Sequence, residues 1–175
     1  MVAGIFFVVC EVLLISGIAK ILFPSPTQSA LSTVGLPSSL FLVRSLGLIE
    51  ILSGILGVLL GGRYLPVIIG AIFAFFTIFI LFALRNAQVA SCGCFGATES
   101  PPSLLHVFAN LLFMVVALLA VGVDGLSHVL GAQPARGIPF IIAILLGALA
   151  SYLILAYAPR VRGKRKLLET LDKSE

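Results

Sequence analysis

The sequence is poor in charge. Only 10% of its 175 residues are Asp, Glu, Lys or Arg, whereas soluble globular domains carry about 25%. A shortage of this size excludes an ordinary soluble domain. In place of charge the chain has apolar runs of about 20 residues each, at 2–23, 40–60, 65–84, 104–123 and 138–157.

Runs of this length predict transmembrane helices, because about 20 helical residues cross about 30 Å of hydrocarbon. None of them alternates over about 10 residues, as the strands of a transmembrane barrel do. We therefore predict an all-α, polytopic membrane bundle of about five transmembrane helices, with a core of four and a C-terminal fifth. The transmembrane domain is expected at 1–158, and a basic juxtamembrane tail at 159–175.

Several sequence motifs are missing, and their absence reduces the number of possible functions. No A-x-A cleavage site follows the first run, which also contains Glu11 and Lys20, so we expect a mature helix rather than a signal peptide. No Gly-rich phosphate loop or DNA-binding motif is present, and we expect no nucleic-acid partner. The net charge of +4 is mostly in the tail, where Lys and Arg fix topology and touch anionic lipid.

The links between the runs are short and polar. Residues 24–39, rich in Pro and Ser, are expected to form a loop with one helical turn. Gly61-Gly62-Arg63 predicts a tight turn, which would pack the second and third runs as an antiparallel hairpin. Pro is tolerated in the first turn of a helix, so the fourth helix is expected to begin near Pro101 or Pro102, with Ser100 as its N-cap.

Cysteine is scarce as well, with three in the chain. Cys10 lies in the first run and is expected to be a small buried hydrophobe. Cys92 and Cys94 lie together in "SCGCFG", just before the fourth run. The start of a helix favours the thiolate form of a cysteine, and a close pair supplies both the attacking and the resolving thiol of an exchange reaction.

Other uses of the pair remain open. Zinc and iron–sulfur sites need about four ligands, and this link offers two cysteines with His106 nearby, so we expect no metal and no cofactor. Soft copper, which needs fewer ligands, and S-acylation of juxtamembrane cysteines are the alternatives. If the pair exchanges disulfides, we expect the Cys92 thiolate to attack the partner disulfide. Cys94, which is followed by apolar Phe95, is expected to resolve the mixed disulfide.

Three ionisable residues lie within the apolar runs. A charged group at the bilayer centre costs about 2.5–3.5 kcal/mol on insertion scales, so it normally faces a partner or a pathway. We expect Lys20 either to pair with Glu50 or to extend toward the interface, while Glu11 needs another partner or a proton. A structural pair, proton handling and ion transport are the three interpretations.

His106 and Asn110 are four residues apart and therefore share a face at the start of the fourth run. One interpretation is an interfacial His in contact with headgroups. The other is that His106 helps to deprotonate or reprotonate a cysteine, a task that suits an imidazole, whose unperturbed pKa is about 6.5.

Three segments together resemble the MauE branch of the MauE/DoxX membrane proteins: "SGIAKILFPSP", "IEILSGILG" and "CGCFG…ESPPSLLHVFANLLF". The resemblance covers about 10–122. It departs from the family at Ala109, where Arg often precedes the Asn, and in having only Arg85 before the cysteines. The residues that match the family pattern are Cys92, Cys94, Phe95, Gly96, Lys20, Glu50 and Asn110.

The resemblance implies a function. MauE supports the maturation of methylamine dehydrogenase, whose small subunit is dense in disulfides, together with the thioredoxin-like protein MauD. A MauD-like redox partner, the lipid bilayer and a bacterial inner-membrane location are therefore expected. A membrane thiol–disulfide redox factor is the first hypothesis. A non-enzymatic assembly factor or small-solute carrier, built on the buried charges, is the second.

Two arguments about the side of the cysteine link disagree. The positive-inside rule counts nine Lys and Arg on the side of the cysteines, six of them in the tail, against Arg63 and Arg136 on the other, and so puts the cysteines in the cytoplasm. An oxidant of secreted proteins would need them outside, where disulfides persist. The sequence leaves the side of the link open.

Overall fold

The computed structural model describes residues 2–85, 103–131 and 137–172, with side chains as far as Leu155. Over these ranges the chain forms helices joined by short links, with two short strands. Their bounds are α1 Val2–Leu22, α2 Ser25–Thr33, α3 Leu40–Leu59, β1 Gly61–Gly62, α4 Tyr64–Arg85, α5 Leu104–Leu119, β2 Val123–Asp124, α6 Leu126–Gly131 and α7 Ile138–Asp172.

The prediction of a helical membrane protein is confirmed. Among the described residues, α1, α3, α4 and the Ile138–Leu155 stretch of α7 are each long and apolar enough to cross a bilayer. The apolar helix α5 has 16 residues and is about 24 Å long at 1.5 Å per residue. It is shorter than the predicted run because the helix ends at Leu119 and the chain then forms β2.

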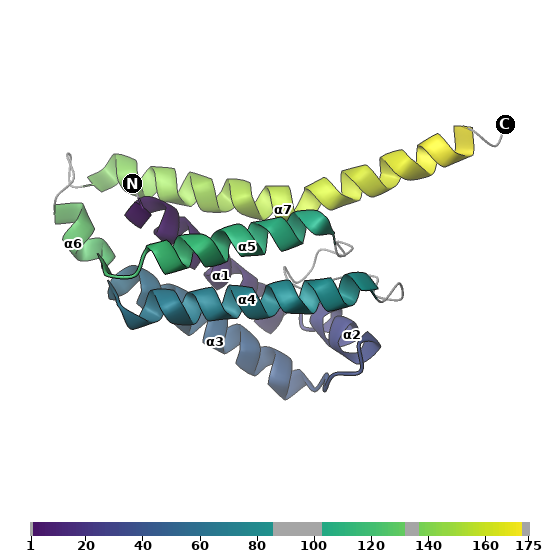
Figure 1. Cartoon of the computed structure of the whole chain (residues 1–175), viewed down its shortest axis with the longest axis horizontal. Helices are drawn as coiled ribbons and strands as arrows, with labels where there is room; N and C mark the ends of the chain where they lie inside the picture. Colours follow the sequence, from purple (N-terminus) through teal and green to yellow (C-terminus); the bar gives the residue numbers. More distant parts are fainter. Residues whose placement is uncertain (1, 86–102, 132–136, 173–175) are drawn as a thin grey trace.

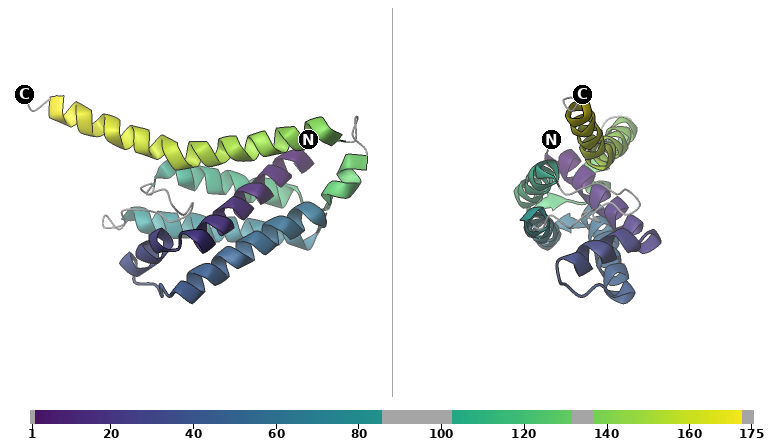
Figure 2. Two further views of the ribbon diagram at one scale, coloured as in Figure 1. Left: turned by 180° about the vertical axis from the view of Figure 1, so that it is seen from behind. Right: turned by 90° about the vertical axis from the view of Figure 1, so that its right-hand side faces the viewer.

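The bundle is built from two antiparallel pairs of helices. α1 packs along α3, and α4 packs along α5, while α7 lies over α1 and α5 (Figures 1 and 2). The predicted hairpin of α3 with α4 is a minor contact, because α3 uses its small-residue face against α1 instead. This arrangement places the ends of α1 and α4, the start of α5 and the helix α2 at one end of the bundle (Figure 1).

Glycines set the distance between α1 and α3. A β-carbon on Gly17 would lie 2.5 Å from the carbonyl oxygen of Gly47, and one on Gly47 would lie 2.8 Å from that of Gly17. A β-carbon on Gly54 would similarly lie 2.7 Å from the carbonyl oxygen of Cys10. Such close backbone approach drives helix association in membranes, where the hydrophobic effect does not.

One predicted link is wrong in detail, and another contains more than the predicted turn. Residues 24–39 contain the nine-residue helix α2 rather than a single turn. The residues after α3 do turn, but they also form β1, which pairs antiparallel with β2: Gly61 opposite Asp124 and Gly62 opposite Val123. Both glycines have positive φ, 58° and 85°, a region that L side chains rarely adopt.

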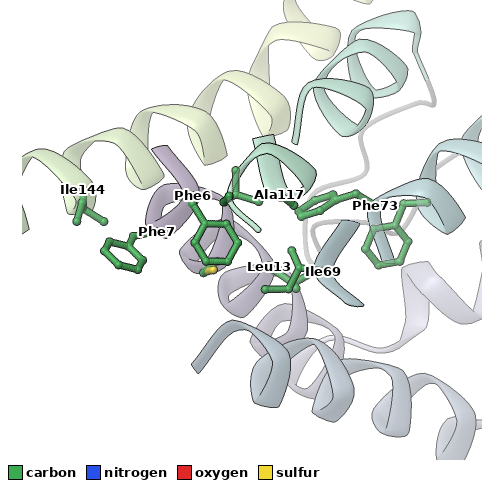
Figure 3. Packing of buried hydrophobic residues seen from close by; sticks show 11 residues of the cluster. Phe6, Phe7, Leu13, Ile69, Phe73, Ala117 and Ile144 are labelled. Atoms are coloured by element: carbon green, nitrogen blue, oxygen red, sulfur yellow. The ribbon is translucent and has the colours of Figure 1, made fainter. Parts of the chain in front are cut away.

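The main core lies where α1, α4, α5 and α7 meet. Figure 3 shows its aromatic and aliphatic side chains, among them Phe6, Phe73, Ala117 and Ile144. The rings of Phe73 and Phe113 pack edge to face with centroids 5.2 Å apart. Cys10 is part of this cluster and is 0% exposed, so the prediction that it is a buried apolar residue is confirmed.

α7 is much longer than a membrane span. It has 35 residues, continues as a helix through the basic region to Asp172, and bends part-way along (Figure 1). Pro159 lies inside this helix. Proline lacks the N–H that would bond the carbonyl four residues back, and it kinks a helix there. The backbone carbonyl of Leu155 therefore loses the N–H that residue 159 would normally donate to it.

Candidate functional site

A buried ion pair joins α1 to α3. Lys20 Nζ lies 2.9 Å from Glu50 Oε2, and the two side chains are 2% and 0% exposed. Lys20 Nζ also donates to Ser16 Oγ, at 2.7 Å, and lies 5.0 Å from the centre of the Phe76 ring. The predicted pair is therefore present, and the alternative that Lys20 extends toward the interface is wrong, because its ammonium group is used inside the bundle.

The glycine contact positions this pair. Gly17 lies three residues before Lys20, and Gly47 three residues before Glu50. Residues three apart share a face of a helix, so the point where the two backbones touch is also the point where the two charges meet. Here a β-carbon on Gly17 would lie 2.9 Å from the β-carbon of Glu50. The close approach of α1 and α3 thus encloses the ion pair.

One oxygen of the pair is not satisfied. Within the described residues, Glu50 Oε1 is buried and has no hydrogen-bond partner. A buried charge is tolerated when it is paired, and removing its partner costs about 3–5 kcal/mol. The arrangement can hold the two helices in register, and it also leaves a buried acceptor for a water molecule or a proton.

Glu11 is not part of this cluster. It lies nine residues before Lys20 on α1, about 14 Å away along the helix axis. Its half-buried side chain lines a groove of about 270 Å³ between α1 and α3 with apolar neighbours such as Leu14, Ile55 and Val58. In the described part of the chain its carboxyl group has no hydrogen-bond or ion-pair partner.

His106 connects α5 to α7. Its side chain is 0% exposed, with Nδ1 2.8 Å from Ser103 Oγ and Nε2 3.1 Å from the carbonyl oxygen of Leu155. A carbonyl can only accept, so Nε2 carries the proton toward Leu155 and Nδ1 accepts from the Ser103 hydroxyl. Leu155 is the residue to which position 159 would normally donate an N–H, and His106 supplies a donor in place of the one that Pro159 lacks.

The surroundings of His106 correct two expectations. The alternative that it contacts headgroups is wrong, because the side chain is fully buried. α5 begins at Leu104 with Ser103, not Ser100, at the N-cap position, and the Ser103 hydroxyl serves the imidazole instead of capping the helix. Asn110, also buried, donates from Nδ2 to the carbonyl oxygen of His106 at 2.7 Å, within the same helix.

The cysteine link lies outside the described residues, and with it Cys92, Cys94, Phe95 and Gly96. The described helices on either side show which end of the bundle it connects. The end of α4 and the start of α5 both lie at the α2 end (Figure 1), where Lys20 occupies the last turn of α1. The ion pair, the His106 cluster and the attachment points of the cysteine link therefore belong to the same half of the molecule.

Comparison with protein families gives one match. The family described as "Methylamine utilisation protein MauE" matches residues 1–123, which include every candidate residue and run from α1 to the start of β2. The chain belongs to the MauE family. It is thus a multi-pass integral membrane protein of a family linked to methylamine utilisation. Searches of curated proteins and of solved structures found no match.

The match to MauE stops before α6 and α7. The Lys20–Glu50 pair and the cysteine link are therefore within the MauE part of the chain. The bond from His106 to Leu155 runs from that part to a helix beyond it. In this member of the MauE family, the start of α5 is fixed by a segment that the family match does not include.

Three contributors to these clusters were not identified from the sequence. Ser16 lies four residues before Lys20 and Ser103 three before His106, both on the same helical face as their partner, so spacing could have found them. The Leu155 carbonyl could have been found only from Pro159, four residues later, which removes its helical donor.

Proposed function

We propose that this protein exchanges disulfides with a partner protein through Cys92 and Cys94. The observation that carries the proposal is the placement of two of the three cysteines one residue apart, in the link that leads into α5. Cys10 cannot share this role, because it is fully buried in the core between α1, α3 and α4. Membership of the MauE family supports a role in methylamine utilisation.

The exchange balances without a cofactor. The Cys92 thiolate attacks one sulfur of a partner disulfide, which forms a mixed disulfide and releases one partner thiolate. The Cys94 thiolate then attacks the Cys92 sulfur, which forms the Cys92–Cys94 disulfide and releases the second partner thiolate. Two electrons pass to the partner, and its two thiolates take up the two protons lost by the cysteines. The reverse sequence oxidises a partner dithiol.

His106 is the proposed acid–base group of this reaction. Both of its ring nitrogens are already hydrogen-bonded, to Ser103 and to Leu155. A proton exchanged with a cysteine must therefore pass through the Ser103 hydroxyl or replace that bond. Ser103 directly follows the cysteine link in the sequence, and we propose that its hydroxyl relays the proton.

We infer that the partner is a thioredoxin-like, MauD-like protein in the bacterial inner membrane, and that the client is methylamine dehydrogenase or another disulfide-rich protein. The test is to trap the mixed disulfide. In a Cys10→Ser background, Cys94→Ala should accumulate a disulfide between Cys92 and the partner, visible on non-reducing gels and lost with dithiothreitol. Cys10→Ser alone is the matched control and should trap nothing. Absence of any adduct from both Cys92→Ala and Cys94→Ala, with activity retained, would rule out the mechanism.

A separate measurement tests which cysteine attacks and which resolves. Alkylation rate against pH, compared between Cys10→Ser proteins that keep only Cys92 or only Cys94, should be faster at neutral pH for Cys92. Faster alkylation of Cys94 reverses the order of attack. Adding His106→Ala to each protein should shift its pH profile if the imidazole exchanges protons with the cysteines, and an unchanged profile removes His106 from the reaction.

A second function is favoured by one feature, the buried and unsatisfied Glu50 Oε1. An assembly factor or small-solute carrier would use the Lys20–Glu50 pair rather than the cysteines. The two functions separate in one comparison. Under the carrier function, replacing Cys92 and Cys94 together with Ser is nearly silent and Glu50→Gln abolishes activity. Under the exchange function, the double Ser replacement abolishes activity.

A further inference from the structure

A groove runs along the outer face of α3 at the α2 end of the bundle. It has a volume of about 590 Å³, within the range of about 300–1,000 Å³ typical of small-molecule sites. Its walls are mostly apolar, and two polar residues interrupt them. The lining residues are Ile21 from α1 and Leu40, Phe41, Arg44, Ser45 and Leu48 from α3.

Arg44 is the unusual member of this set. Its side chain is exposed, and in the described part of the chain it has no carboxylate partner. It is four residues from the start of α3, about 6 Å into the span along the axis. A guanidinium at this depth reaches the phosphate level of a bilayer by extending its chain. Within the described residues, the buried Lys20 and Glu50 neutralise each other, so neither of them offsets the charge of Arg44.

The remaining features of the groove fit the same kind of ligand. Phe41 is 83% exposed on its wall, and its ring offers an acyl chain a large apolar surface. The start of α3 is the positive end of its helix dipole, which attracts anions. The apolar side chains of Leu40 and Leu48 continue the groove along the span. The positively charged Arg44 at the membrane edge thus lies beside an apolar groove that is open to the lipid.

We propose that this groove binds an anionic phospholipid, with Arg44 on the headgroup phosphate and an acyl chain along the apolar wall. The proposal does not depend on the cysteine chemistry. Inorganic phosphate shares the headgroup chemistry but lacks the chain, so the apolar wall favours the lipid as occupant.

The chain contains no tryptophan, which gives the test a clean reporter. Phe41→Trp places a single tryptophan on the groove wall, and it can be excited selectively over the three tyrosines. The protein is reconstituted in phosphatidylcholine vesicles that contain phosphatidylglycerol, with brominated acyl chains on one lipid at a time. We expect brominated phosphatidylglycerol to quench the tryptophan with an apparent affinity about fivefold higher than brominated phosphatidylcholine, the effect of about one basic residue near the surface.

The controls separate this site from general attraction of anionic lipid. Arg44→Gln should remove the preference, and Arg63→Gln, an exposed arginine in the link between α3 and α4, should keep it. Equal quenching by both lipids, or a preference that survives Arg44→Gln, would overturn the proposal. Relief of quenching by millimolar inorganic phosphate would overturn the lipid as occupant in favour of a soluble phosphate.

Discussion

His106 Nε2 on α5 lies 3.1 Å from the backbone carbonyl oxygen of Leu155 on α7. This bond replaces the one that Pro159 cannot donate within α7. In a helix with an internal proline, the carbonyl four residues earlier is normally exposed or hydrogen-bonded to water. Here a buried imidazole from another helix satisfies it, and the same imidazole accepts from Ser103 at the start of α5.

The first prediction is that His106→Ala destabilises the protein through this carbonyl. It leaves the Leu155 carbonyl and the Ser103 hydroxyl without a protein partner, which should cost about 1–3 kcal/mol. Pro159→Ala restores an N–H to position 159, so the cost of His106→Ala should fall by about 1 kcal/mol in that background. Thermal unfolding in detergent of the four proteins of this cycle measures both values. Equal costs in the two backgrounds would show that His106 does not compensate for the donor missing at Pro159, and no cost in either would show that the bond carries no stability.

The second prediction concerns the Lys20–Glu50 pair. Lys20→Met or Glu50→Leu alone leaves one buried charge unpaired, and each should lower the free energy of unfolding by about 3–5 kcal/mol. The double replacement removes both charges and should recover most of the loss. Unfolding titrations in mixed micelles provide the comparison. A double variant as unstable as the sum of the singles contradicts a structural pairing and favours separate roles.

The third prediction is that the close approach of α1 and α3 does not tolerate a methyl group. Gly47→Ala would bring its β-carbon to 2.8 Å from the Gly17 carbonyl oxygen and 3.2 Å from the β-carbon of Lys20. Overpacking of this kind costs about 1–3 kcal/mol, and it should also loosen the ion pair. Gly131→Ala is the matched control, since no atom of the described residues lies within 4 Å of its added β-carbon. If both variants unfold at the same temperature as the wild type, the contact is not tight.

The fourth prediction concerns membrane orientation. Lys20 is neutralised by Glu50, so it no longer contributes to the charge difference between the two sides. Without the tail, two arginines remain on each side, and the positive-inside rule then depends on residues 160–175 alone. We expect the cysteine link to resist a membrane-impermeant maleimide in intact cells of the Cys10→Ser protein. Replacing the tail Lys and Arg with Gln should give mixed labelling. Full labelling of the Cys10→Ser protein with its basic tail intact would place the cysteine link outside the cell membrane.

The sequence was sufficient for the helical membrane class, for four of the five predicted spans and for one polar contact. Lys20 and Glu50 could be paired because each is costly alone in a membrane. The helix α2 was missed because its prolines at 24 and 26 suggested a loop. Both lie at the start of the helix, where proline is tolerated.

Contacts between distant segments were harder to predict. The strands β1 and β2 have two residues each, too few to show alternation. The bond from His106 to Leu155 spans 49 residues, and its acceptor is a backbone atom, which no side-chain pattern records. For this reason the interfacial interpretation of His106 was wrong, although its neighbour Asn110 was correctly placed on the same helix.

The length of α7 has a mechanical consequence. From Leu155 to Asp172 the helix continues for 17 residues, about 25 Å, as a stiff arm rather than a loose chain. Pro159 interrupts the hydrogen bonds of this arm and so provides a pivot at which it can bend, and His106 on α5 bonds to the Leu155 carbonyl just before that pivot. A change of about 10° at the pivot would move the far end of the arm by about 4 Å. Any shift of the residues that follow the cysteine link would therefore be amplified at the basic end of the chain.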